Sequence, residues 1–291
     1  MTPKLIPTTR GRRADGERGL DVNKEVRFPS FDGTALFGMV DVPTKPRALI
    51  VIVHGLCEHL GRYDYLAARL VAQQFAVFRF DHRGHGRSQG ERVFYTDFNE
   101  IVDDTNSAWE VAQREVPGLP TYVLGHSMGG YAAALFATKY AAKPAGVVLS
   151  GALTRYNLQL VGPLPLAGDP RTYLPNELGA GVCSDPGVGE AYVADPLVEK
   201  QMSVGLINTW AGGLEYLKRE ASAFVAPALI LHGADDGLVS NQDSRDLYGE
   251  IGSTDKSLRI YAGMMHEIFN EYDKDEVIAD VLAWLDRRVP A

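Results

Sequence analysis

Short apolar runs alternate with amphipathic or alanine-rich stretches along most of the chain. The predicted strands lie at residues 48–53, 75–80, 122–124, 145–149, 227–233 and 257–261. The stretches between and after them predict helices at residues 61–74, 98–116, 131–140, 241–250 and 273–289. A hairpin with an Asp32–Gly33 turn precedes them, at residues 26–40. Strands that alternate with helices in this way indicate a mostly parallel sheet with helices on both faces.

This alternation stops after residue 150. Residues 151–223 hold six prolines and many glycines, and no strand pattern is visible there. We expect a cap of short helices and loops, inserted into the sheet-forming core. The chain is therefore divided into a flexible leader (residues 1–23), a core (24–150 and 224–291) and a cap (151–223).

Composition narrows the class of protein. The chain has 291 residues, of which 45% are hydrophobic, so it can bury the core of one large α/β domain. A net charge of -8 excludes the broad basic surface that nucleic-acid binding requires. The apolar runs are too short to span a bilayer, and the N-terminus has no signal-peptide core, so we expect a cytoplasmic protein. Cys57 and Cys183 lie far apart and are expected to be free thiols.

A serine lies between two glycines where the strand at 122–124 meets the helix at 131–140. Gly125, Ser127 and Gly129 form the pattern G-x-S-x-G. A turn this sharp brings backbone segments so close that only glycine avoids a Cβ clash. The pattern predicts a nucleophile elbow, which holds the Ser127 hydroxyl at the edge of the sheet, over a helix N-terminus.

A nucleophilic serine needs a base, and the base needs an acid that orients it. In hydrolases with this elbow the chain order is nucleophile, acid, histidine. His266 follows the last predicted strand and is the only histidine after His232, so it is the predicted base. Asp235 and Asp236 are both candidate acids; the spacing H-G-x-x-D favours Asp236, with Asp235 as a capping residue. Asp243 is a remoter candidate, expected to be a solvated helix residue.

Acyl transfer also needs donors for the developing oxyanion. One is the backbone N–H of Met128, the residue after the nucleophile. The second is expected from the loop after the strand at 48–53, at the N–H of Leu56. His54 is expected to order this loop by hydrogen bonding.

Histidines are also paired at His54 and His59 and at His82 and His85. Neither pair has the spacing or the cysteine partners of a metal site, so we expect no metal and no cofactor. Residues 81–88 are instead expected to form a compact turn held by their own polar side chains.

With these motifs the chain resembles the monoacylglycerol lipase and lysophospholipase group of α/β-hydrolases, bacterial members above all. The matching motifs are H-G-x-x-E-H-x-x-R-Y from His54, D-H-R-G-H-G-x-S from Asp81, G-H-S-M-G-G from Gly125, H-G-x-x-D from His232, and His266-Glu267 followed by F-N-E. The resemblance runs from about residue 26 to the C-terminal helix and is weakest in the cap.

The resemblance implies an α/β-hydrolase fold, a Ser127, Asp236 and His266 triad, and an oxyanion hole formed by the N–H groups of Leu56 and Met128. It also implies a mobile, amphipathic cap that meets membranes or lipid aggregates, and therefore a peripheral membrane contact. One departure concerns the oxyanion loop, where the group usually has glycine at the position of Cys57.

The expected activity is the hydrolysis of glycerol-lipid esters, with monoacylglycerol as the leading substrate and an acyl-enzyme formed on Ser127. A lysophospholipase or a general carboxylesterase is the close alternative. A prolyl-type aminopeptidase would need carboxylates in the cap, and a non-catalytic relative would commonly lose a triad member. Arg155 and Tyr156 begin the cap and are expected at the mouth of the substrate pocket.

Overall fold

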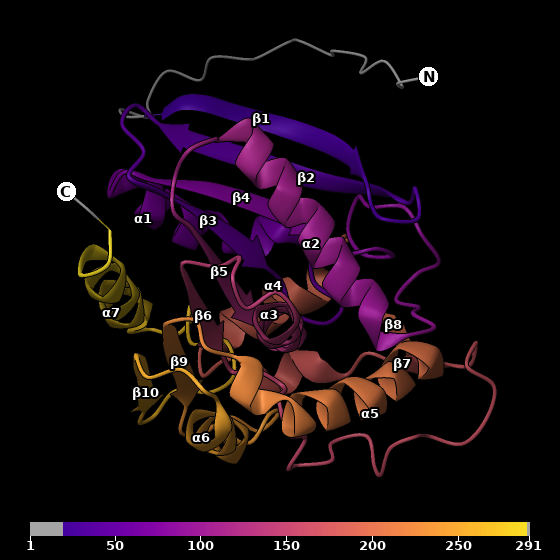
Figure 1. The fold of residues 1–291 in the computed structure, drawn as a ribbon. Helices are drawn as coiled ribbons and strands as arrows, with labels where there is room; N and C mark the ends of the chain where they lie inside the picture. Colours follow the sequence, from indigo (N-terminus) through magenta and orange to yellow (C-terminus); the bar gives the residue numbers. More distant parts are fainter. Residues whose placement is uncertain (1–19, 290–291) are drawn as a thin grey trace.

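A computed structural model describes residues 20–289, and its centre is an eight-stranded sheet (Figure 1). The strand order is β1-β2-β4-β3-β5-β6-β9-β10. The β1–β2 and β2–β4 pairs are antiparallel, and the other neighbours are parallel. The strands are β1 (Leu20–Pro29), β2 (Ala35–Pro43), β3 (Ala48–Val53), β4 (Phe75–Asp81), β5 (Thr121–His126), β6 (Gly146–Ser150), β9 (Ala228–Gly233) and β10 (Lys256–Tyr261). The mostly parallel sheet is therefore confirmed.

Helices cover both faces of the sheet. α1 (Asp64–Ala72) and α7 (Lys274–Asp286) pack on one face, and α2 (Phe98–Glu115) and α3 (Met128–Lys139) on the other. Successive residues of β3 point alternately into these two apolar layers, which is why all six had to be apolar. α6 (Asn241–Glu250) lies against β9 and β10.

The first strand begins earlier than predicted. Leu20 is already paired with Pro43, and the ladder continues through Asn23 and Lys24, which the sequence assigned to a leader or left unassigned. An edge strand needs only backbone groups for its ladder, so polar side chains do not prevent it from forming. The rest of the predicted leader, residues 1–19, lies outside the described part of the chain.

The segment 151–223 contains more regular structure than predicted. Two short strands, β7 (Tyr173–Pro175) and β8 (Gln201–Ser203), pair with each other, so the expectation of no strand was wrong. Three residues are too few for a visible hydrophobic period. The helices are η2 (Leu178–Gly181), α4 (Pro186–Ala194), α5 (Val204–Arg219) and η3 (Ala221–Ala223). α5 packs against α2 and α3, which brings this segment over the core (Figure 1).

The parallel strands determine where the loops with the predicted site residues lie. The loops after β3, β5, β9 and β10 leave the same edge of the sheet, because the carboxyl ends of parallel strands meet there. These loops carry Leu56, Ser127, Asp236 and His266.

Two simpler expectations concern the whole molecule. Cys57 and Cys183 are both buried and free, as predicted. Between residues 20 and 289 no helix has the length and hydropathy needed to cross a membrane.

Candidate active site

Ser127 occupies the turn between β5 and α3. Its backbone is in the left-handed region, with φ 54°, a strained conformation that is typical of residues held in place for chemistry. Backbone packing explains the flanking glycines: a Cβ on Gly125 would lie 2.3 Å from the carbonyl oxygen of Gly129, and one on Gly129 would lie 2.1 Å from that of Val53. The predicted elbow therefore has the close backbone approaches that require glycine.

His266 contacts Asp236 and not the neighbouring Asp235. His266 Nδ1 lies 2.7 Å from Asp236 Oδ2, while Asp235 is exposed to solvent. The backbone N–H groups of Leu238 and Val239 donate to Asp236 Oδ1 at 2.8 and 2.9 Å. The carboxylate is thus held on both oxygens, and it fixes the orientation of the imidazole ring.

The contact shifts the pKa of both partners. Burial acts to raise the pKa of Asp236, but the charge of His266 and hydrogen bonds from His232 and His266 hold it well below its ordinary value. Burial likewise acts to lower the pKa of His266, and the Asp236 carboxylate overcomes this and raises it above 6.5. Asp236 therefore stays ionised, and His266 is a stronger base than a free histidine.

The loop after β3 is ordered by His54, as predicted. The backbone N–H of His82 donates to His54 Nε2 at 3.0 Å, so this nitrogen carries the lone pair. The proton is then on Nδ1, which donates to the carbonyl of Gly55 at 2.8 Å. Burial keeps the pKa of His54 well below its ordinary value, so the ring is neutral. Leu56, the next residue, lines one cavity together with Met128, Ser127 and His266.

Cys57 takes a positive φ of 63° in this loop, where the related group usually has glycine. Its side chain is completely buried, and burial raises the pKa of the thiol far above its ordinary value. The carbonyl of Cys57 accepts a hydrogen bond from the N–H of Glu199 at 2.8 Å. A cysteine therefore fits this left-handed position, and the loop still reaches the cavity through Leu56.

Comparisons with known proteins identify the family. The family model described as serine aminopeptidase S33 matches residues 44–273. The chain belongs to this family. A monoacylglycerol lipase of Mycolicibacterium smegmatis is 37% identical over 83% of this chain and 89% of its own length. The human monoglyceride lipase is 32% identical over 88% of each chain.

Two solved structures have the same fold as this S33-family chain. A monoacylglycerol lipase of Paleococcus ferrophilus superposes with a TM-score of 0.73 at 27% identity, covering 92% of this chain and 99% of the other. A soluble variant of the Saccharomyces cerevisiae monoglyceride lipase, in complex with a substrate analogue, superposes with a TM-score of 0.81, covering 98% of this chain and 100% of the other. Its sequence identity of 24% supports the fold alone. The S33-family chain is a serine hydrolase with the α/β-hydrolase fold.

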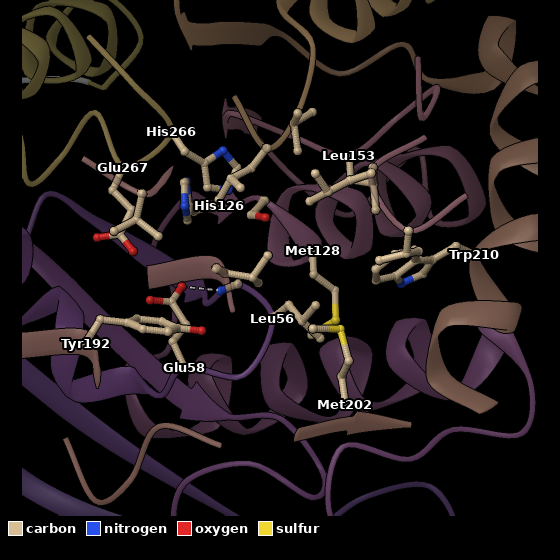
Figure 2. Close-up of a pocket in the computed structure, with 18 of the residues that line it drawn as sticks. Leu56, Glu58, His126, Met128, Leu153, Tyr192, Met202, Trp210, His266 and Glu267 are labelled. Atoms are coloured by element: carbon tan, nitrogen blue, oxygen red, sulfur yellow. Dashed lines mark hydrogen bonds between the residues drawn. The ribbon is translucent and has the colours of Figure 1, made fainter. Parts of the chain in front are cut away.

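Ser127 lines a cavity of this S33-family hydrolase in which polar and apolar side chains lie on different sides (Figure 2). Leu153, Met202 and Trp210 lie on one side, beyond Met128 and Leu56. On the other side, next to His266, lie four polar residues: Glu58, His126, Tyr192 and Glu267. Glu58 and Glu267 belong to motifs already noted in the sequence, but the sequence alone gave them no role.

His126 is a neutral neighbour of His266 in this cavity. The two rings lie 4.6 Å apart between centroids, and His126 Nδ1 is 3.1 Å from the Ser150 hydroxyl oxygen. Burial, together with the charge of His266, lowers the pKa of His126 to about 3. His126 therefore adds polarity but no charge to this side of the cavity.

Arg155 and Tyr156 were both expected at the pocket mouth, but only one of them lines the cavity. Tyr156 lines the cavity, and its hydroxyl donates to the carbonyl of Gly162. Arg155 instead donates to Glu250 at 2.6 Å, with a side chain that is only 5% exposed, and it is not among the lining residues. Asp243, expected to be solvated, is completely buried and binds the backbone that carries both residues.

The polar loop after β4 is compact, as predicted. Asp81 accepts from the N–H groups of Leu60 and Arg87, and the Ser88 hydroxyl donates to the Asp81 carbonyl. Burial lowers the pKa of His82 to about 3 and that of His85 to about 4, so both are neutral. Within residues 20–289 no three histidine, cysteine or acidic side chains gather in a way that could hold a metal ion.

Proposed function

We propose that this enzyme hydrolyses monoacylglycerols through an acyl-enzyme on Ser127. His266 Nε2 takes the proton from the Ser127 hydroxyl as its oxygen attacks the ester carbonyl, and Asp236 orients His266 through Nδ1. The backbone N–H groups of Leu56 and Met128 donate to the oxyanion. His266 then gives its proton to the departing glycerol oxygen, and a water molecule releases the fatty acid by the same steps.

The division of the cavity by polarity is the observation that carries this substrate. The leaving group must lie beside His266, because His266 has to protonate it. That side carries the carboxylates of Glu58 and Glu267. Each already accepts three hydrogen bonds from the protein, and a carboxylate has about four acceptor sites, so each can accept one more from a glycerol hydroxyl. The acyl chain then extends to the other side, toward Met202 and Trp210, where the lining is apolar.

The same orientation disfavours an aminopeptidase. In a peptide substrate the N-terminal ammonium belongs to the acyl half, so a carboxylate would have to lie on the side away from His266. The lining residues described there are apolar, and both carboxylates lie on the leaving-group side. An ammonium in the apolar half would be buried without a partner, at a cost of several kcal/mol.

A lysophospholipid head group is also a poor match. Its phosphate would enter the half that holds Glu58 and Glu267, and the described lining residues include no lysine or arginine. Arg62 contacts both carboxylates, but its guanidinium is already bound to them. A neutral head group avoids the repulsion that an anion would meet here.

In this proposal residues 151–223 form a cap that moves to admit the substrate. The free space in the cavity is about 60 Å³, well below the range of about 300–1,000 Å³ that is common for ligand sites. Leu158 and Leu160 are 46% and 47% exposed, and Leu160 also lines the cavity. We expect this part of the cap to touch lipid surfaces when substrate enters.

The test compares four substrates on the purified enzyme: a monoacylglycerol, a diacylglycerol, lysophosphatidylcholine and an aminoacyl p-nitroanilide. Monoacylglycerol is expected to give the highest kcat/KM, and Ser127→Ala to abolish its hydrolysis. Faster hydrolysis of the lysophospholipid would refute the argument from charge. Hydrolysis of the anilide alone would refute the orientation of the substrate.

A further inference from the structure

A buried charge cluster lies beside the catalytic groups, and the proposed reaction leaves its arginine, Arg62, without a role. The cluster consists of Glu58, Arg62, Tyr63, Glu267 and Asn270. Arg62 is at its centre and is 10% exposed, while the Glu58 and Glu267 side chains are 4% and 6% exposed. These charges are largely removed from water, so their interactions are strong only if the geometry is kept.

Arg62 binds both carboxylates at the same time. Its Nη1 donates to Glu58 Oε2 at 2.8 Å and to Glu267 Oε1 at 2.6 Å, and its Nη2 donates to Glu267 Oε2 at 2.7 Å. The contact with Glu267 is therefore bidentate, which fixes direction as well as distance. The Tyr192 ring covers the guanidinium at 4.8 Å from its centroid.

Through Glu58 the cluster reaches the oxyanion loop. Glu58 Oε1 accepts the backbone N–H of Gly55 at 2.5 Å, the dashed line in Figure 2. The same oxygen accepts the Tyr63 hydroxyl at 2.6 Å. Gly55 directly precedes Leu56, whose N–H is the proposed second oxyanion donor. The orientation of the carboxylate therefore sets the path of the backbone that enters this donor.

Through Glu267 the cluster reaches the loop of the base. Glu267 directly follows His266, and Asn270 donates to Glu267 Oε2 at 2.7 Å. The backbone N–H of Glu267 donates to the carbonyl of Val182 at 2.6 Å. The residue after the base is thus fixed at its side chain and at its backbone.

We infer that Arg62 is a positioning residue, which ties the loop of the oxyanion donor to the loop of the base and so holds Leu56 and His266 in one fixed relation to Ser127. The inference rests on the roles proposed above for these three residues. It does not depend on which ester is the natural substrate. Arg62 itself is not among the residues that line the cavity around Ser127, so its proposed role is to act through Glu58 and Glu267.

The two loops are far apart in sequence, so only a contact between them can hold the oxyanion donor and the base in a fixed relative position. The chain separates Arg62 from Glu267 by 205 positions, and no strand pairs the two loops directly. A planar guanidinium can bind two carboxylates in defined directions, whereas a lysine ammonium is a point charge. A displacement of about 1 Å between catalytic groups can lower the rate by about 100-fold.

The experiment measures steady-state kinetics with p-nitrophenyl butyrate and binding of a phenylboronic acid, which forms a tetrahedral adduct with the serine. Arg62→Met is expected to lower kcat by about 100-fold and to weaken boronate binding in parallel, with KM changed by less than about threefold. Arg62→Lys should fall between wild type and Arg62→Met. Adding Glu267→Gln to Arg62→Met should cost little more, because both act on one contact.

Arg83→Met is the matched control. Arg83 is 8% exposed and binds the buried Asp104 with two hydrogen bonds, and it has no contact with Glu58 or Glu267. This variant should lose stability to a similar extent as Arg62→Met, measured by thermal unfolding, while kcat per active site stays at the wild-type level. Active sites are counted by titration with a fluorophosphonate.

Three results would overturn the inference. One is a folded Arg62→Met enzyme with unchanged kcat, and another is a loss confined to KM. The third is an equal loss of kcat in Arg83→Met, which would mean that destabilisation alone explains the effect. If Arg62→Met does not fold, Arg62→Lys and Glu267→Gln decide by the same criteria.

The natural substrate is tested separately in the same assays. A wild type that cleaves p-nitrophenyl butyrate but no monoacylglycerol refutes the proposed substrate and leaves the role of Arg62 open to the tests above. A wild type that cleaves no ester overturns both.

Discussion

Replacing Asp243 by alanine should destabilise the protein at residues 154–157. The Asp243 carboxylate is completely buried and accepts the backbone N–H groups of four successive residues: Thr154, Arg155, Tyr156 and Asn157, at 3.3, 2.9, 2.7 and 3.0 Å. A carboxylate that accepts four N–H groups fixes a turn that has no other regular structure.

The magnitude follows from what alanine leaves behind. The N–H of Thr154 is fully buried, and losing its partner costs about 1–3 kcal/mol. Arg155 and Tyr156 are half-buried and Asn157 is exposed, so water can replace part of each of these bonds. We expect Asp243→Ala to lower the free energy of unfolding by about 3–5 kcal/mol in total. Because Tyr156 lines the cavity, KM for a long-chain ester should also rise.

The assay is urea unfolding followed by circular dichroism, together with ester kinetics. Asp246→Ala is the matched control, because Asp246 lies on the same helix and also accepts from Asn157 Nδ2, but binds none of the four backbone N–H groups. We expect this control to lose less than about 1 kcal/mol. A loss of that size in Asp243→Ala itself, or equal losses in both variants, would refute the reasoning.

Three more outcomes can be checked on the same enzyme. In pH–rate profiles, kcat/KM should rise with pH as His266 loses its proton, with a midpoint above pH 6.5. Asp236→Asn should move this midpoint to lower pH and should lower kcat by about 10⁴-fold. Met202→Trp should fill the apolar half and lower kcat/KM for long-chain p-nitrophenyl esters by about tenfold or more, with acetyl ester hydrolysis unchanged. Gly129→Ala would place its Cβ 2.1 Å from the Val53 carbonyl oxygen, and should lower the free energy of unfolding by about 3 kcal/mol or more in urea titration.

The elements that the sequence predicted well are those buried on both faces. The apolar run at 48–53 coincides with β3 (Ala48–Val53), because every position of a central strand packs against a helix layer. The edge strand β1 and the short strands β7 and β8 lack this signal. β1 carries polar residues on an exposed edge, and β7 and β8 have three residues each, so neither leaves a hydrophobic period to detect.

Local sequence motifs predicted site residues well, whereas contacts between residues far apart in the chain could not be predicted. The H-G-x-x-D spacing correctly favoured Asp236 as the partner of His266. Asp243 was misjudged because its partners lie 86–89 positions earlier in the chain, and a helix position alone does not say what faces it. The contact between Arg62 and Glu267 could not be predicted for the same reason, although both residues stand in recognisable motifs.

Residues 151–223 touch both loops that hold the proposed catalytic groups, in part through their backbone. The N–H of Glu199 donates to the Cys57 carbonyl in the oxyanion loop, and the Val182 carbonyl accepts from the N–H of Glu267, next to His266. Backbone contacts place few demands on side-chain identity. Side chains of residues 151–223 that line the cavity, such as Trp210, can therefore set the shape of the proposed acyl half while these backbone contacts to the two loops are kept.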